Sequence, residues 1–180
     1  MIILSLDLSF AKTGWAISKV DLNNNNIELI DCGLLVSPTS LEAIERMDHT
    51  ITDIISIKKK YKPDLIIKES AIMGRSSTGL NVIKMHGAFE YKCFVDLVPL
   101  DEIHNQTIKA WARRYLINKE IYTKETIKDV DKKLIVALAI QEYYNRDIKE
   151  IYTARGRLLD DIADAIAITI SYVEKHYSYK

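Results

Sequence analysis

The sequence predicts an α/β protein in which helices pack against a mixed sheet. Three runs of strand-like sequence open the chain at residues 2–8, 14–20 and 27–36, and short polar turns join them, so we expect an antiparallel meander. A helical pattern then separates this meander from the apolar run at residues 65–68. A strand reached through a helix usually lies parallel to its neighbour, so the fourth strand makes the sheet mixed.

Composition and charge narrow the possible functions. The chain has 180 residues, enough for one domain with a substantial core, and we expect a single domain over residues 1–180. Its 25 basic and 25 acidic residues cancel, so any binding to nucleic acid must come from a local patch. Cys32 and Cys93 lack metal-ligand spacing, which argues against a zinc site or a disulfide framework. No long apolar run or basic leader is present, so we expect a cytoplasmic protein without a membrane span.

The first strand carries one charged side chain. Its other residues are nearly all apolar, which is typical of a strand buried on both faces. An unpaired carboxylate in such a strand loses its hydration at a cost of several kcal/mol. Asp7 therefore needs a partner, and a metal ion is the obvious candidate. The alternative is an acid that caps the turn at residues 9–14.

The middle of the chain places a second acid in a similar position. Thr39 and Glu42 have the spacing of a capping box, so we expect a helix from there until shortly before the strand at residues 65–68. Glu69 comes at the carboxyl end of that strand. Ligands of open α/β sheets bind at this end of the strands, so Asp7 and Glu69 are expected at one ligand-binding edge.

The second half of the chain is expected to add one strand and four helices. The strand is at residues 97–103. One helix covers residues 79–94, a second is capped by Asn105, a third begins at Lys132 and the last begins near Leu159. Residues 117–130 are charged and irregular, and no role is assigned to them.

The last helix brings three acids together. Asp160, Asp161 and Asp164 lie near its start, beside an apolar face. Negatively charged side chains in the first turn of a helix interact favourably with the helix dipole. This interaction explains the presence of Asp160 and, in part, of Asp161. Asp164 lies further into the helix between apolar residues and fits that explanation less well. The helical spacing leaves open whether the functional pair is 160/164 or 161/164.

Acids from the first strand, the fourth strand and the last helix can converge at one edge of the sheet. Without a cation, their repulsion raises their pKa values and destabilises the edge. Oxygen ligands without His or Cys suit Mg²⁺ or Mn²⁺, and two such ions about 4 Å apart activate a water and stabilise the leaving oxygen of a phosphodiester. The pattern indicates metal-dependent phosphodiester hydrolysis.

The residues around these acids resemble a known family. Asp7 with the stretch at 13–16, Glu69 at the end of a strand and the stretch at 161–167 are similar, in order and spacing, to the RuvC family of Holliday junction resolvases in the RNase H-like superfamily. The phage branch is the most similar. The resemblance implies an RNase H-like five-stranded mixed sheet flanked by helices, a homodimer and metal-dependent nicking of four-way DNA junctions. It also implies two Mg²⁺ or Mn²⁺ ions held by Asp7, Glu69, Asp161 and Asp164.

The resemblance extends to basic residues that face DNA. The proposed phosphate contacts are Lys109, Lys132, Lys133, Arg113 and Arg75. Ordinary solvated lysines on a charged helix face are an equally good explanation for each lysine.

Two further features bear on the resemblance. Bacterial family members place an aromatic wedge shortly after the acid of the fourth strand, whereas this chain has Ile72 and Met73 there. That difference leaves the preference among junctions, forks and flaps open. The helix from Gly79 matches the family's dimerisation helix, although its apolar face would look the same if it packed only on its own core.

Three other functions fit parts of the pattern. An actin-like phosphotransferase also opens with a strand and an Asp, Thr and Gly turn, but the six glycines form no nucleotide-binding loop, so we expect no nucleotide cofactor. A DNA-binding scaffold with this fold would not need the four acids. An RNase H-type nuclease acting on RNA/DNA hybrids remains open, because the same metal site hydrolyses either backbone.

Overall fold

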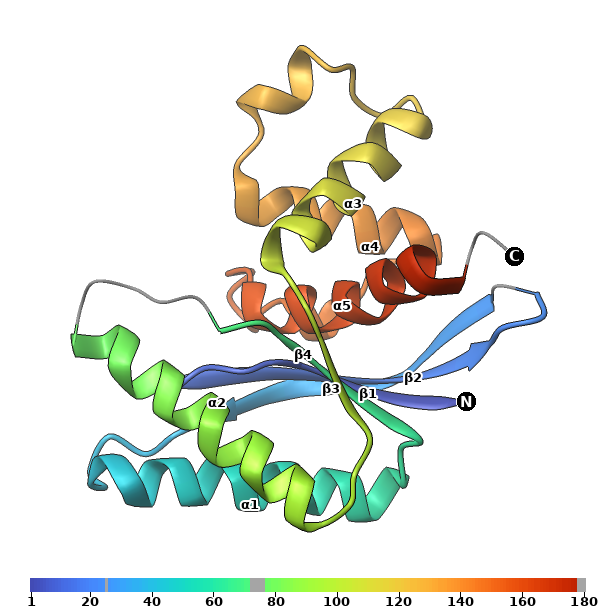
Figure 1. Ribbon diagram of the computed structural model, residues 1–180. Coiled ribbons are helices and arrows are strands. Elements are labelled where there is room, and N and C mark those ends of the chain that lie inside the picture. Colours follow the sequence, from blue (N-terminus) through green and yellow to red (C-terminus); the bar gives the residue numbers. More distant parts are fainter. Residues whose placement is uncertain (25, 72–76, 178–180) are drawn as a thin grey trace.

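The computed structural model describes residues 1–24, 26–71 and 77–177, and it has three layers (Figure 1). A sheet forms the middle layer, with α1 and α2 on one face and α5, α4 and α3 on the other. The strands are β1 (Ile2–Asp7), β2 (Lys12–Asp21), β3 (Asn26–Val36), β4 (Leu65–Glu69) and β5 (Leu100–Ile103). The helices are α1 (Ala43–Tyr61), α2 (Ser77–Val95), α3 (Asn105–Asn118), α4 (Lys132–Tyr144) and α5 (Asp160–Tyr177), with 3₁₀ turns at Thr126–Asp129 and Lys149–Ile151.

The sheet has the predicted mixed topology. Its strand order is β3-β2-β1-β4-β5. β1, β2 and β3 pair antiparallel, and β4 lies parallel to both β1 and β5. The expected meander followed by parallel strands is therefore confirmed. Because β1 and β4 run in the same direction, their carboxyl ends lie at the same edge of the sheet.

The first strand is buried on both faces, as its apolar run predicts. Ile3 belongs to the core beneath α3, α4 and α5, whereas Leu4 and Leu6 belong to the core beneath α1 and α2. Each of these side chains is inaccessible to solvent, and burying one aliphatic side chain contributes about 1.5–3 kcal/mol. Alternation along the strand places Asp7 on the same face as Ile3, which is the face that α5 covers.

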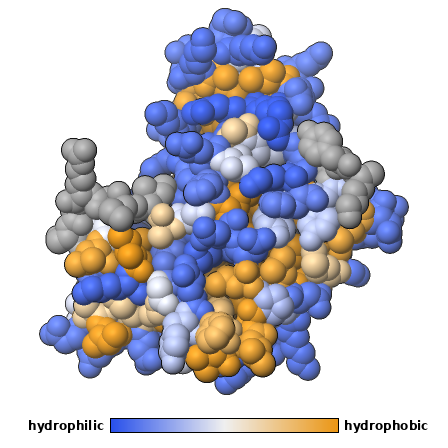
Figure 2. Space-filling view, viewed as in Figure 1, coloured by the Kyte–Doolittle hydropathy of each residue, from blue (hydrophilic) through white to orange (hydrophobic). Residues whose placement is uncertain are grey.

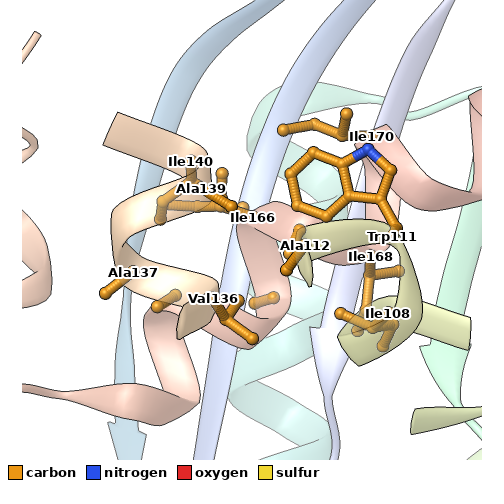
Figure 3. Close-up of a cluster of buried hydrophobic side chains, with 14 of the residues drawn as sticks. Ile108, Trp111, Ala112, Val136, Ala137, Ala139, Ile140, Ile166, Ile168 and Ile170 are labelled. Atoms are coloured by element: carbon orange, nitrogen blue, oxygen red, sulfur yellow. The ribbon is translucent and has the colours of Figure 1, made fainter. Parts of the chain in front are cut away.

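α5 is the central helix of its layer. Nearly every residue from Ile162 to Val173 is buried, because the sheet lies on one side of the helix and α3 and α4 lie on the other. Figure 3 shows Trp111 and Ile108 from α3 packed beside side chains of α4 and α5. This packing fixes the start of α5 relative to the sheet.

The predicted start of the first helix is wrong. α1 begins at Ala43, and its capping box joins Glu42 and Glu45 instead of Thr39 and Glu42. The displacement has a physical reason: Pro38 accepts a backbone hydrogen bond from Leu41 in a separate turn that precedes the helix. In the described ranges, no helix has both the length and the apolar character needed to span a membrane.

Candidate active site

Asp7 and Glu69 lie at the ends of neighbouring strands. β1 and β4 are paired in register up to Leu6 and Lys68, and the two acids follow as the next residues of their strands. The charge of Glu69 raises the pKa of Asp7, and the side chain of Asn105 at the start of α3 lies near Glu69 and lowers its pKa. The two acids therefore lie at one edge of the sheet, as predicted.

The start of α5 brings the remaining acids to this edge. Burial raises the pKa of Asp7 well above its usual range, and the nearby charges of Glu69, Asp164, Asp161 and Asp160 raise it further. Burial, together with the Glu69 charge, raises the pKa of Asp164 to about 7. The acids that the resemblance names thus form one electrostatically coupled group, which we call the acidic edge (Asp7, Glu69, Asp161 and Asp164).

Asp160 and Asp161 are less enclosed. Burial and the neighbouring Asp160 raise the pKa of Asp161, which the Lys12 charge opposes. The Asp160 carboxylate pairs with the Lys133 ammonium at 2.6 Å and so has a counter-ion of its own. This contact makes Asp160 a residue at the rim and supports 161/164 as the pair that faces Asp7.

A glycine allows the close approach of α5 to the sheet. Gly14 is the cross-strand partner of Asp7. A β-carbon at Gly14 would lie 1.9 Å from the Asp161 carbonyl oxygen and 2.3 Å from its carbonyl carbon, far inside van der Waals contact. Any other residue at position 14 would push the start of α5 away from Asp7.

Some of the predicted DNA-binding residues lie at the acidic edge, and others do not. Lys109 lies near Glu69 and Asp164 and lowers the pKa of both. Lys133 pairs with Asp160 at the rim of the acidic edge. Lys132 is exposed beside Lys133 at the start of α4. Arg113 is half-buried one helical turn beyond Lys109, in a pocket with Lys124 and Lys128. Arg75, like Ile72 and Met73, falls outside the described residues.

Sequence reasoning missed three residues at this edge. Asn105 was expected to cap α3, but it is the first residue of the helix, and its side chain lowers the pKa of Glu69. Lys12 and Gly14 belong to β2 and reach the edge only through pairing in the sheet. The one sign in the sequence that β2 reaches this edge was the Thr13 and Gly14 pair, which follows a buried strand.

The donor set fits a hard divalent cation. All four side chains of the acidic edge are carboxylates. Burial raises the pKa of each of them, and neighbouring carboxylates raise the pKa values of Asp7, Asp161 and Asp164 further, so a cation between them relieves both penalties. Within the part of the chain that the structure describes, no three Asp, Glu, His or Cys side chains are placed so that together they could hold a metal ion, so a bound cation would have to draw these carboxylates closer.

The curated proteins that match this chain in sequence are named RuvC. No protein-family model matches the chain. It is 28% identical over 109 residues to the crossover junction endodeoxyribonuclease RuvC of Prochlorococcus marinus strain MIT 9313, covering 61% of this chain and 70% of that protein. The RuvC of strain MIT 9211 is 26% identical over 158 residues, which cover 82% of this chain and 99% of that protein.

The fold agrees with these sequence relatives. Thermus thermophilus RuvC, solved in complex with a Holliday junction substrate, superposes with a TM-score of 0.71 over 98% of both chains at 15% identity. The likeness confirms the predicted RNase H-like fold. This chain is therefore similar in sequence to curated RuvC proteins and similar in fold to a RuvC that was solved with a Holliday junction.

Proposed function

We propose that this protein is a metal-dependent endonuclease that resolves Holliday junctions and other branched DNA. The observation that carries the proposal is the acidic edge, which brings together acids from β1, β4 and α5 on the fold of a junction resolvase. The relatives that match the chain are named as crossover junction endodeoxyribonucleases. The name of these relatives indicates the proposed substrate, a DNA crossover junction. The acidic edge indicates the proposed chemistry, metal-dependent hydrolysis.

We assign the acidic edge as the metal-binding and catalytic centre. Asp7, Glu69, Asp161 and Asp164 would hold two Mg²⁺ or Mn²⁺ ions. When bound, such ions supply an activated water and a charge that stabilises the leaving oxygen of the phosphodiester. Asn105 stabilises the Glu69 carboxylate, and Lys109 supplies a positive charge beside the carboxylates at which a phosphate can be positioned.

The proposed path of the DNA follows the basic residues around this edge. Lys109 is nearest to the acids, Arg113 continues along α3, and Lys132 and Lys133 mark the start of α4. These side chains come from two helices that lie above the sheet edge in Figure 1. They would neutralise phosphates and orient a junction without reading its base sequence.

We also propose that the protein is a homodimer and that residues 1–180 form one domain. α2 exposes Leu80, Tyr91, Phe94 and Val95, with Leu97 directly after it. Figure 2 shows hydrophobic atoms gathered over the lower part of the molecule, where α1 and α2 lie. Exposed apolar side chains along one helix favour association with a second copy, and two centres in one dimer could nick opposed strands. One sheet shared by both cores supports a single domain.

A panel of substrates tests the proposed function. Purified protein with Mg²⁺ is incubated with an end-labelled four-way junction, a Y-fork, a flap, a linear duplex and an RNA/DNA hybrid, with Asp7→Asn as the inactive control. We expect paired nicks on the junction that disappear in Asp7→Asn. Cleavage of only the hybrid would replace the proposal with an RNase H activity, and binding without metal-dependent cleavage would leave a DNA-binding scaffold.

A further inference from the structure

A lysine is buried directly behind the acidic edge. Lys68 precedes Glu69 in β4, and strand alternation sends its side chain to the opposite face of the sheet, towards α2. The Lys68 side chain is only 2% exposed. A lysine is almost never buried this completely unless it is paired. The partners of Lys68 therefore indicate what holds this part of β4 in place.

Two carboxylates pair with this lysine. The Lys68 Nζ lies 2.7 Å from Glu102 Oε2 on the adjacent strand β5 and 3.0 Å from Glu90 Oε1 on α2. Lys68 and Glu102 are also direct partners in the strand register. The lysine thus ties β4 to β5 and to α2 one residue before Glu69.

A histidine from α2 holds the neighbouring strand. His86 Nε2 lies 2.9 Å from the carbonyl oxygen of Leu8, and the His86 side chain is buried. Leu8 follows Asp7, the last residue of β1, and so lies beyond the end of the strand ladder. Burial lowers the pKa of His86, so the imidazole is neutral and donates from Nε2 to this carbonyl. His86 and Glu90 are one helical turn apart on the same face of α2.

We infer that His86 and Lys68 are positioning residues for the proposed metal centre: they fasten β1 next to Asp7 and β4 next to Glu69 to a single helix, α2. The inference rests on the proposed function, because it assumes that these acids bind metal. Neither side chain reaches the acids themselves, since both lie on the other face of the sheet. Partners that orient metal ligands typically change metal affinity or activity by 10–100-fold when removed.

Calorimetric titration with Mn²⁺ alone is the first test, using His86→Leu and Lys68→Met. Each variant keeps much of the side-chain volume and removes the polar contact. We expect the affinity for Mn²⁺ to fall about tenfold in each. His86→Gln, which keeps a donor directed at the Leu8 carbonyl, should recover most of the lost affinity. In junction cleavage, kcat should fall at limiting Mg²⁺ while KM for DNA stays unchanged.

A matched control separates positioning from general loss of stability. Met85 is buried on α2 next to His86 in the hydrophobic core, so Met85→Ala disturbs the same helix without removing a polar contact to either strand. Circular dichroism first establishes that every variant is folded at the assay temperature. The inference is overturned if folded His86→Leu and Lys68→Met bind Mn²⁺ as wild type does, or if Met85→Ala loses as much affinity as they do.

The same titration distinguishes this inference from the proposed function. If the wild type binds Mn²⁺ and the variants bind it weakly, the positioning role stands even where no branched DNA is cut, and only the proposed function fails. If the wild type binds no Mn²⁺, both fail together.

Discussion

The backbone of Asp161 lies directly against Gly14. A β-carbon built on Gly14 would come within 1.9 Å of the Asp161 carbonyl oxygen. Gly14 is also paired with Asp7 across the sheet, so one residue connects the strand acid and the helix acids. The missing side chain at position 14 is therefore what allows α5 to bring its acids to β1.

Gly14→Ala is expected to displace the start of α5. Because the new methyl group meets backbone atoms that cannot rotate away, we expect a loss of unfolding free energy of at least about 1–3 kcal/mol, as for overpacked cores, and loss of metal-dependent cleavage. Urea denaturation and the junction assay measure the two effects. Gly87→Ala is the control, because a β-carbon there has no atom within 4 Å. Wild-type stability and activity in Gly14→Ala would contradict the placement of α5.

Removal of a buried acid should increase stability while abolishing activity. Burial and four neighbouring acids raise the pKa of Asp7, so its ionised form destabilises the metal-free fold. Asp7→Asn removes that charge, and we expect a higher melting temperature in EDTA together with at least a hundredfold loss of cleavage, on the order seen when a central catalytic group is removed. Asp48→Asn, at an exposed position on α1, should change neither. A lower melting temperature for Asp7→Asn would show that Asp7 has a stabilising partner.

The stability of the metal-free protein should fall as pH rises. The folded-state pKa of Asp164 is about 7 against an ordinary value of 3.8, so the fold favours the protonated acid. This contribution is fully present below about pH 4, is lost as pH rises through about 7, and amounts to at most about 4 kcal/mol. Urea denaturation in EDTA from pH 4 to 8 measures it, and Asp164→Asn should flatten the curve. Mg²⁺ should stabilise the protein more at pH 8 than at pH 5, because protons compete with metal for the carboxylates. A flat profile for the wild type would contradict the buried, coupled state of Asp164.

Lys109→Met should weaken both DNA binding and catalysis. Lys109 lowers the pKa values of Glu69 and Asp164, so its removal raises them and shifts the pH dependence of cleavage to higher pH. If Lys109 also binds a phosphate, the salt dependence of junction binding should decrease by about one unit of slope. Lys59→Met, on the opposite face of the molecule, is the control. An unchanged pH profile would show that Lys109 does not act on the acids.

The sequence was sufficient to predict how the strands bring two acids together, because this depended only on short-range patterns. Asp7 and Glu69 each follow an apolar strand, and the helix between those strands makes them parallel. Glu102 and Glu90 could not be paired with Lys68 from the sequence, since β5 and α2 meet that lysine only in the folded protein. The close contact of Gly14 with Asp161 likewise joins residues far apart in the chain. Lys68 itself gave a signal, as a lysine inside an otherwise apolar strand, that the sequence analysis did not use.

An anomalous difference map from crystals grown with Mn²⁺ shows whether the acidic edge binds metal. We expect Mn²⁺ between Asp7, Glu69 and the start of α5, with carboxylate oxygens about 2.0–2.3 Å from the metal, as is usual for hard divalent cations. The same crystals of Asp7→Asn should lose this signal. Mn²⁺ bound elsewhere, or no signal at the acidic edge in crystals of protein that cleaves junctions, would contradict the assignment of these four acids.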